Sequence, residues 1–305
     1  LLLDAPEDDE ALALLSSALL SVQRYTEAAE VILERAGLAQ TRERRVTLLL
    51  EGARLYTGPI GDPAGAMAHY ESVFQVTPGH PEAIADLLRM AKIKDSSESA
   101  AVLVIPQLEQ MSRWADLAEV YKARSELADD PTEAAEARRQ LAKIRYERLS
   151  DPAGSLAASN LLMDRVGAED LRPVLEYTAR LSVLLDRAEE HVESLAKRAA
   201  RSELDPAARL LIAQAAAGVA EEILGDRARA LGLLATMLEA GIADEATTRH
   251  IERLARASGD KRLLAKALRE SAKLAVGQPG RSDILVRLGD AEFDTGELAG
   301  ATEAY

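Results

Sequence analysis

Apolar positions in this chain recur in short blocks separated by polar turns, and the blocks repeat. Glu51–Ala66 aligns without gaps with Gln140–Ser155, and Ala216–Ala230 falls on the same frame. Three aligned positions hold similar residues in all three segments. They are apolar (Ile60, Leu149 and Leu224), aspartate (Asp62, Asp151 and Asp226) and alanine (Ala53, Ala142 and Ala217). Repetition on a fixed frame predicts an array of similar structural units rather than one globular core.

A second family of segments repeats on its own frame. Arg24–Ile32 aligns with Arg113–Tyr121, and Gly259–Leu268 continues the pattern. Two kinds of unit are therefore predicted to alternate along the chain. Two antiparallel helices with two short turns take about 34 residues, and the predicted second helices are mostly spaced by roughly 34 to 40 residues. These helices are expected to begin near Tyr25, Pro63, Ala115, Pro152, Arg187, Arg227, Lys261 and Glu297.

Local signals support the helix boundaries. An aspartate followed by a proline suits a helix start, because the side chain can cap the helix and proline fits its first position. This dipeptide occurs at Asp62-Pro63 and Asp151-Pro152. Glycine tolerates the left-handed conformation that often ends a helix. Three glycines are predicted to lie at helix ends: Gly167, Gly241 and Gly277.

Composition restricts the fold class to all-α. Hydrophobic residues make up 48% of the chain but aromatic residues only 3%, so the core must be built from small and medium side chains. Ala and Leu dominate, both are strong helix formers, and runs of β-branched residues are nearly absent. We expect Ala53, Ala142 and Ala217 to let paired helices approach closely, with Tyr70 and Leu234 filling the adjoining space.

The segment Gly61–Ala83 resembles the second helix of a tetratricopeptide repeat. Ala66, Tyr70, Val73 and Pro78 match the family's pattern of a small, an aromatic, a small and a final proline residue. The chain as a whole is similar to long bacterial arrays of such repeats. This resemblance implies a right-handed α-solenoid of stacked antiparallel helix pairs, with about eight pairs in a single array over residues 1–305.

One segment departs from the regular spacing. Pro81–Arg113 is too long for a single first helix, so we expect an insertion or an extra helix near residues 95–112. Asp95–Ser97 has the composition of a helix break and cap. Ala100–Ile105 could form a buried stripe or an exposed docking patch, and we favour burial because an exposed apolar run promotes aggregation.

Charge argues against nucleic-acid binding. Acidic residues number 51 and basic residues 37, giving a net charge of −14 that would repel a phosphate backbone. The densest basic cluster, Arg42–Arg45, is interpreted as a solvated helix start. With no cysteine, disulfides and cysteine-ligated metals are excluded, and a cytoplasmic or a periplasmic location fits equally well. Leu1 and Tyr305 suggest that the chain is a fragment, and no segment of it is apolar and long enough to insert in a membrane.

No pattern predicts catalysis or a cofactor. The four histidines are not spaced three or four residues apart, and no nucleophile-elbow or phosphate-loop string occurs. Adjacent acids such as Asp129-Asp130 and Glu221-Glu222 are interpreted as solvated helix faces rather than acid–base pairs. We therefore expect a chain that is not an enzyme and that binds neither metal nor cofactor.

The resemblance also implies where a partner would bind, in a concave groove lined by the first helices. The residues it places there are Arg54, Arg139, Lys143, Tyr146 and Gln214. The expected function is a scaffold that binds a partner peptide or helix. The alternatives are a regulatory receptor for a peptide or ligand, or an accessory non-catalytic region of a larger enzyme or cell-envelope machine. We expect reversal of Arg54, Arg139 and Lys143 to glutamate to weaken capture without changing the melting temperature.

Overall fold

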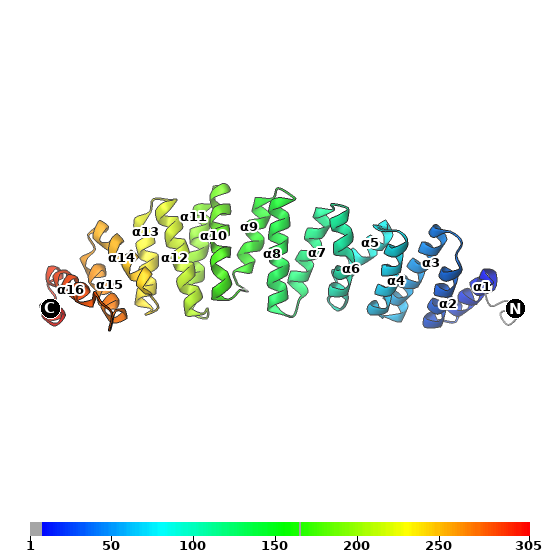
Figure 1. Cartoon of the computed structure of the whole chain (residues 1–305), viewed down its shortest axis with the longest axis horizontal. Helices are drawn as coiled ribbons and strands as arrows, with labels where there is room; N and C mark the ends of the chain where they lie inside the picture. Colours follow the sequence, from blue (N-terminus) through cyan, green and yellow to red (C-terminus); the bar gives the residue numbers. More distant parts are fainter. Residues whose placement is uncertain (1–7, 165) are drawn as a thin grey trace. The chain divides into compact units, whose positions relative to one another are not determined.

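The computed structural model describes residues 8–164 and 166–305, and within these ranges the chain is all-α (Figure 1). It divides into two compact units, with the boundary between Ala158 and Ser159. Most helices that follow each other along the sequence pack side by side. The prediction of an all-α chain built from stacked antiparallel helix pairs is confirmed, and the pairs are tetratricopeptide-like in length and spacing.

In its described residues, 8–158, the first unit has eight complete helices and the beginning of a ninth. Their bounds are α1 (Asp9–Ser21), α2 (Tyr25–Leu38), α3 (Arg42–Leu55), α4 (Pro63–Val76), α5 (Pro81–Met90), α6 (Ser97–Gln110), α7 (Trp114–Leu127), α8 (Pro131–Glu147) and α9 (Pro152–Leu162). A π-helical turn, Tyr56–Ile60, follows α3, and a 3₁₀ turn, Lys94–Ser96, precedes α6. Both turns lie where the chain changes direction between helices.

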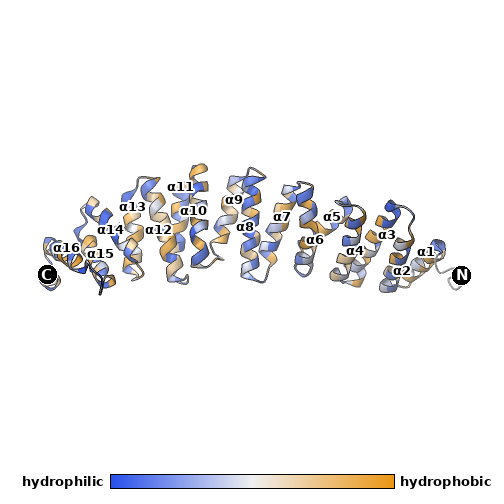
Figure 2. Cartoon of the chain, viewed as in Figure 1, coloured by the Kyte–Doolittle hydropathy of each residue, from blue (hydrophilic) through white to orange (hydrophobic). Residues whose placement is uncertain are grey.

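The second unit has the same arrangement of consecutive helices. Its helices are α10 (Ala168–Leu184), α11 (Ala188–Ala199), α12 (Pro206–Glu222), α13 (Arg227–Glu239), α14 (Glu245–Ser258), α15 (Lys261–Leu274), α16 (Arg281–Thr295) and α17 (Leu298–Ala304). Figure 2 shows hydrophobic and hydrophilic residues alternating along most of these helices, as expected when one face packs and the other meets solvent.

The predicted second helices begin within one residue of their expected positions. They are α2, α4, α7, α9, α11, α13, α15 and α17. The long segment Pro81–Arg113 holds two helices, α5 and α6. In α6, Ala100, Ala101 and Val104 are buried, whereas Val102 is 62% exposed. The expectation that this apolar run is mainly buried is therefore confirmed.

The turns inside the helix pairs are of two kinds, which differ by one residue. In the first kind, the last residue before the second helix donates its backbone N–H to the carbonyl five residues earlier. The bonds run from Arg24 to Leu19 (2.9 Å), Arg113 to Leu108 (2.9 Å), Arg187 to Ser182 (2.7 Å), Asp260 to Ala255 (3.0 Å) and Glu297 to Glu292 (2.9 Å). In the second kind, the carbonyl lies six residues earlier. These bonds run from Asp62 to Tyr56, Asp151 to Arg145 and Asp226 to Ala220, each at 2.8 Å.

The two kinds of turn correspond to the two repeated sequence families. They alternate from the α1–α2 turn to the α14–α15 turn, and only the last turn, before α17, repeats the first kind. In every one of these turns, the residue directly before the hydrogen-bond donor has a positive φ, from 53° at Ser150 to 83° at Gly296. Glycine adopts this conformation without strain, whereas Gln23, Ser112, Ser150 and Asp186 do so at a steric cost.

The predicted helix starts are confirmed, and two of the three glycines predicted at helix ends lie there. Asp62 accepts from the backbone N–H of Gly65 at 3.0 Å, and Asp151 accepts from Gly154 at 2.8 Å. Gly241 and Gly277 are left-handed, as expected. The prediction for Gly167 is wrong: its φ is −70°, and it precedes the first residue of α10. A glycine with no side chain to cap the helix can begin a helix as well as end one.

The predicted core positions are buried. Ala53 and Tyr70 lie in the core of the first unit, and Ala217 and Leu234 lie in a core of the second unit. Each is at most 1% exposed. Arg42, Arg44 and Arg45 begin α3 and are exposed, which confirms the interpretation of this cluster as a solvated helix start.

Candidate functional site

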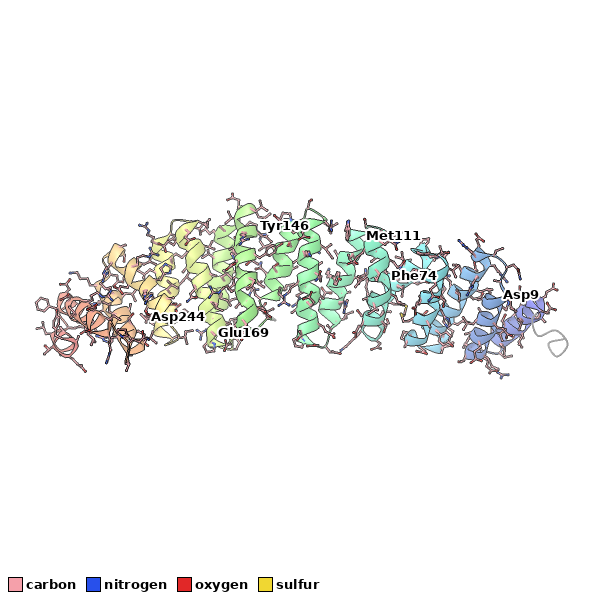
Figure 3. The ribbon with its side chains drawn as sticks, in the orientation of Figure 1. Asp9, Phe74, Met111, Tyr146, Glu169 and Asp244 are labelled. Atoms are coloured by element: carbon pink, nitrogen blue, oxygen red, sulfur yellow. The ribbon has the colours of Figure 1, made fainter. Side chains whose placement is uncertain are left out.

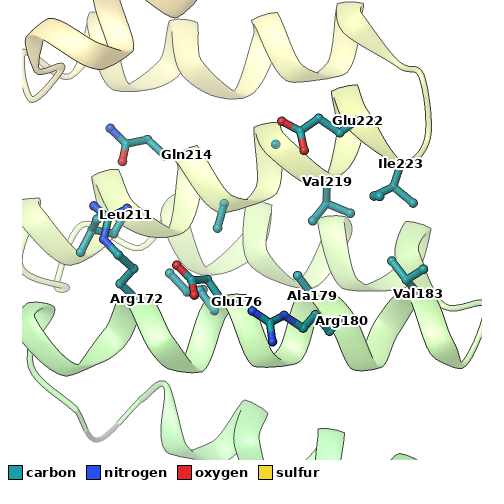
Figure 4. A pocket seen from close by; sticks show the side chains of 13 residues that line it. Arg172, Glu176, Ala179, Arg180, Val183, Leu211, Gln214, Val219, Glu222 and Ile223 are labelled. Carbon is teal, nitrogen blue, oxygen red and sulfur yellow. The ribbon is translucent and has the colours of Figure 1, made fainter.

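A groove of about 720 Å³ runs between α10 and α12, the first helices of two successive pairs in the second unit (Figure 4). Both helices pack on each other and on α11. They run in the same direction, so that side chains one turn apart on α10 face their counterparts on α12. Figure 4 shows this order as Arg172, Glu176, Arg180 and Val183 along α10 and Leu211, Gln214, Val219 and Ile223 along α12.

The floor of the groove is apolar and open. Leu175 and Ala179 contribute from α10, and Ala215, Gly218 and Val219 contribute from α12. A Cβ atom placed on Gly218 would have no heavy atom within 4 Å, so the space above this glycine is empty of protein. Small residues at three of these five positions leave room for side chains of another molecule.

The rim of the groove combines charges with exposed apolar side chains. Arg172, Glu176 and Arg180 are exposed on α10, and Glu222 is exposed on α12. None of these four makes a side-chain hydrogen bond or ion pair with any residue in the described ranges. At the end of the groove nearest the turns, Ile223 on α12 is 52% exposed. These groups are solvated and available to a ligand, which is the combination found in binding sites.

Local sequence fixes the two helices that form the groove. At the start of α12, Asp205 accepts from the backbone N–H of Ala208 at 3.0 Å, and Pro206 occupies the first helical position. Arg209 donates from Nε to the carbonyl oxygen of Ala199 at 3.0 Å, which joins α12 to the end of α11. The groove walls are therefore held by helix caps and backbone contacts that do not involve the rim charges.

Two side chains of α12, Gln214 and Glu221, make polar contacts with α14 and its capping residue. Gln214 donates from Nε2 to Thr247 at 2.8 Å and to Asp244 at 3.2 Å. Glu221 accepts from Arg253 through both carboxylate oxygens at 2.7 Å and contacts His250 at 2.7 Å. The hydrogen bonds from Arg253 and then His250 lower the pKa of Glu221 to about 2. The interpretation of Glu221 as a solvated helix face is therefore wrong, whereas its neighbour Glu222 is exposed as expected.

Arg54, a predicted binding residue, forms contacts within the chain. Its Nε donates to Asp86 at 2.9 Å and its Nη2 donates to Glu82 at 2.8 Å, which joins α3 to α5. The Asp86 side chain is only 5% exposed, and the hydroxyl of buried Tyr70 also contacts it at 3.4 Å. Glutamate at position 54 would place its carboxylate beside those of Asp86 and Glu82. We therefore expect this charge reversal to lower stability, which corrects the expectation of an unchanged melting temperature.

Three other predicted binding residues lie on α8, in the first unit. Arg139, Lys143 and Tyr146 follow one face of this helix at helical spacing, and Lys143 is exposed. Arg139 donates to Glu136 at 3.4 Å, one turn earlier. Tyr146 is 43% exposed and lies near the last turn of α8 (Figure 3). None of these three residues lines the α10–α12 groove. Their role in binding stays a prediction.

Of the five predicted residues, Gln214 alone lines the α10–α12 groove. The sequence analysis did not single out Arg172, Glu176 and Arg180, although their spacing of four residues places them on one helix face. It also passed over the run Ala215–Gly218, whose small side chains keep the floor open. A search for four-residue charge spacing beside a run of small residues would have found this surface.

The described residues can be searched for metal sites and for membrane-spanning helices. Within residues 8–164 and 166–305, no group of three or more histidine, aspartate or glutamate side chains is placed to hold a metal ion. The same part of the chain has no helix with the length and apolar character needed to cross a membrane. Tetratricopeptide-like repeat folds are typically non-catalytic, and the expectation that this chain is no enzyme stays a prediction.

Comparison with known proteins finds likeness only among solved structures. No family model and no curated protein matches the chain. A tetratricopeptide repeat protein from Parabacteroides merdae is 15% identical with a TM-score of 0.26, and the match covers 85% of this chain and 90% of that one. A monomeric mutant of IFIT1 with the capped RNA m7Gppp-AAAA is 13% identical with a TM-score of 0.23, and the match covers 97% of this chain and 73% of that one. The tetratricopeptide-like character of the chain follows from its own helix pairs.

Proposed function

We propose that this chain is a scaffold for protein interaction and that it holds a segment of a partner protein in the α10–α12 groove. The observation that carries the proposal is the open apolar floor around Gly218, flanked by exposed charges whose side chains make no hydrogen bond or ion pair with the described residues. Buried apolar area supplies binding free energy, and rim charges select the partner and its orientation.

Two features favour a polypeptide over a small ligand. The groove has exposed residues on both of its long walls, from Arg172 to Val183 on α10 and from Leu211 to Ile223 on α12. Among the described residues that line it, no charged side chain is buried where it could orient a small molecule.

The test blocks the groove without touching its charges. Gly218→Trp would fill the space above the floor, and Gly218→Ala serves as the matched control because a Cβ atom fits there. Wild-type protein and both variants are used for affinity capture from native lysate, and the captured segment is identified and then titrated against all three. We expect the segment to bind the wild type and Gly218→Ala alike and to lose at least tenfold in affinity for Gly218→Trp. Equal affinity for Gly218→Trp would refute the groove as the binding site.

A further inference from the structure

We infer that the partner segment is an amphipathic α-helix. On the face that contacts α10, this helix carries an acidic, a basic and an acidic side chain, spaced four residues apart. This inference rests on the proposed function and gives the chemistry of the partner. It is drawn from the order of the rim charges, from the geometry of the floor and from the symmetry of the charge pattern.

The charges on the α10 wall alternate in sign at regular intervals. Arg172, Glu176 and Arg180 are four residues apart, which corresponds to about 6 Å between successive charges along the helix axis. All three are exposed, and each lies on the face that lines the groove (Figure 4). A helix that lies alongside α10 has the same rise, so charges at its own four-residue spacing would meet all three in turn.

The floor favours a helix over an extended peptide. A helix satisfies its own backbone hydrogen bonds, whereas an extended chain would place unpaired N–H and C=O groups against Ala179, Ala215 and Gly218. Neither wall offers a strand edge to pair with, because both walls are helices. The small floor residues also let a helix approach closely, as small residues do at other helix contacts. A short apolar stripe on the partner would then fill the space above Gly218.

The same charge pattern argues against a second copy of this chain as the occupant. The order arginine, glutamate, arginine reads the same in both directions around Glu176. If two copies packed through α10 about a two-fold axis at this residue, Arg172 would face Arg180 of the other copy and the two Glu176 side chains would face each other. Like charges in contact destabilise a complex. The groove is therefore suited to a different chain with the opposite charges.

The test uses two synthetic helical peptides that share an apolar stripe and differ in three residues. One carries glutamate, lysine, glutamate at four-residue spacing, and the other carries lysine, glutamate, lysine. Each pattern also reads the same in both directions, so peptide orientation does not affect the comparison. Binding to the full chain is measured by fluorescence anisotropy at physiological salt. Three exposed ion pairs predict about tenfold tighter binding of the first peptide, although the net charge of the chain, −14, favours the second.

A charge-reversed protein supplies the reciprocal experiment. The triple variant Arg172→Glu, Glu176→Arg and Arg180→Glu alters exposed side chains only, and far-UV circular dichroism checks that it remains folded. We expect this variant to prefer the second peptide by a similar factor. The same preference in both proteins would overturn the inference.

The outcomes also separate the inference from the proposed function. One outcome is that both peptides bind equally to the wild type and that Gly218→Trp abolishes the binding of both. The groove would then bind helices without selecting them by charge order, so the inference would fail while the proposed function would stand. If neither peptide binds, the inference fails, and the captured natural segment decides the proposed function independently. A captured segment that binds in the groove without helix formation, measured by circular dichroism of the complex, would overturn the inference as well.

Discussion

Glu221 is expected to stabilise the contact between α12 and α14, and its removal gives the sharpest test of how the first helices are joined. The Glu221 side chain is 12% exposed and receives two hydrogen bonds from Arg253 and one contact from His250, all at 2.7 Å. We predict that Glu221→Gln lowers the free energy of unfolding, because the amide keeps the shape of the side chain but loses its charge.

The magnitude follows from the pKa of Glu221. Hydrogen bonds from Arg253 and His250 lower this pKa from 4.5 to about 2, and a change of that size corresponds to ~3 kcal/mol in favour of the ionised folded state. Arg253 is 58% exposed, so solvent screening reduces the expected loss to about 1 to 2 kcal/mol. Because the pKa is lower in the folded state, this contribution is complete above the unfolded pKa of 4.5. It disappears as the pH falls from 4.5 towards 2.

The assay is urea unfolding followed by far-UV circular dichroism, at pH 7 and at pH 3. The matched control is Glu222→Gln, since Glu222 is the next residue, is exposed and has no ion pair in the described ranges. We expect the loss from Glu221→Gln at pH 7 to shrink at pH 3 and the control to stay within about 0.5 kcal/mol of the wild type. A loss that is the same at both pH values, or an equal loss in the control, would refute the reasoning.

Three further predictions concern the turns, the helix packing and a buried histidine. Ser112→Gly should stabilise the chain by about 0.5 to 1 kcal/mol in urea unfolding, because the φ of Ser112 is 55°, and no gain would show that this turn is unstrained. Gly65→Ala should destabilise the chain by about 1 to 3 kcal/mol, because a Cβ atom there would lie 2.5 Å from a carboxylate oxygen of the capping aspartate. As the control, Gly232→Ala should stabilise its helix, because a Cβ atom there meets no other atom. The opposite order of melting temperatures would contradict the packing. Burial lowers the pKa of His191 to about 4, so stability should fall as pH drops from 6.5 towards 4, and His191→Gln should make this fall smaller.

Much of the fold could be predicted from the sequence, because each repeat carries its own turn signal. Asp62, Asp151 and Asp226 align because each lies at the end of the same six-residue turn and caps the helix that follows. The error at Gly167 has a simple physical reason. A glycine marks a break between helices, but without its φ it does not show whether it ends one helix or begins the next.

The candidate site was harder to predict, because polar groups on neighbouring first helices can pair with each other instead of with a partner. Arg54 and Gln214 were both expected to face a ligand, yet Arg54 pairs with Asp86, and Gln214 donates to Thr247. These partners are about thirty residues away in the sequence, so their proximity depends on how the helix pairs stack. Exposure of a charge without a partner, as at Arg172, becomes visible only in the structure.

The most direct test of the groove as the binding site is site-specific photo-crosslinking at two glycines. A photoreactive residue with a small aliphatic diazirine side chain, less bulky than the tryptophan that should block the groove, replaces Gly218 in the groove or, as the matched control, Gly232 on the exposed surface of α13. Both positions have open space where a side chain would be added. The proposed function predicts that the captured partner crosslinks through position 218 and not through position 232. Crosslinking at position 232 alone, or at neither position while the partner remains bound, would contradict the assignment of the α10–α12 groove.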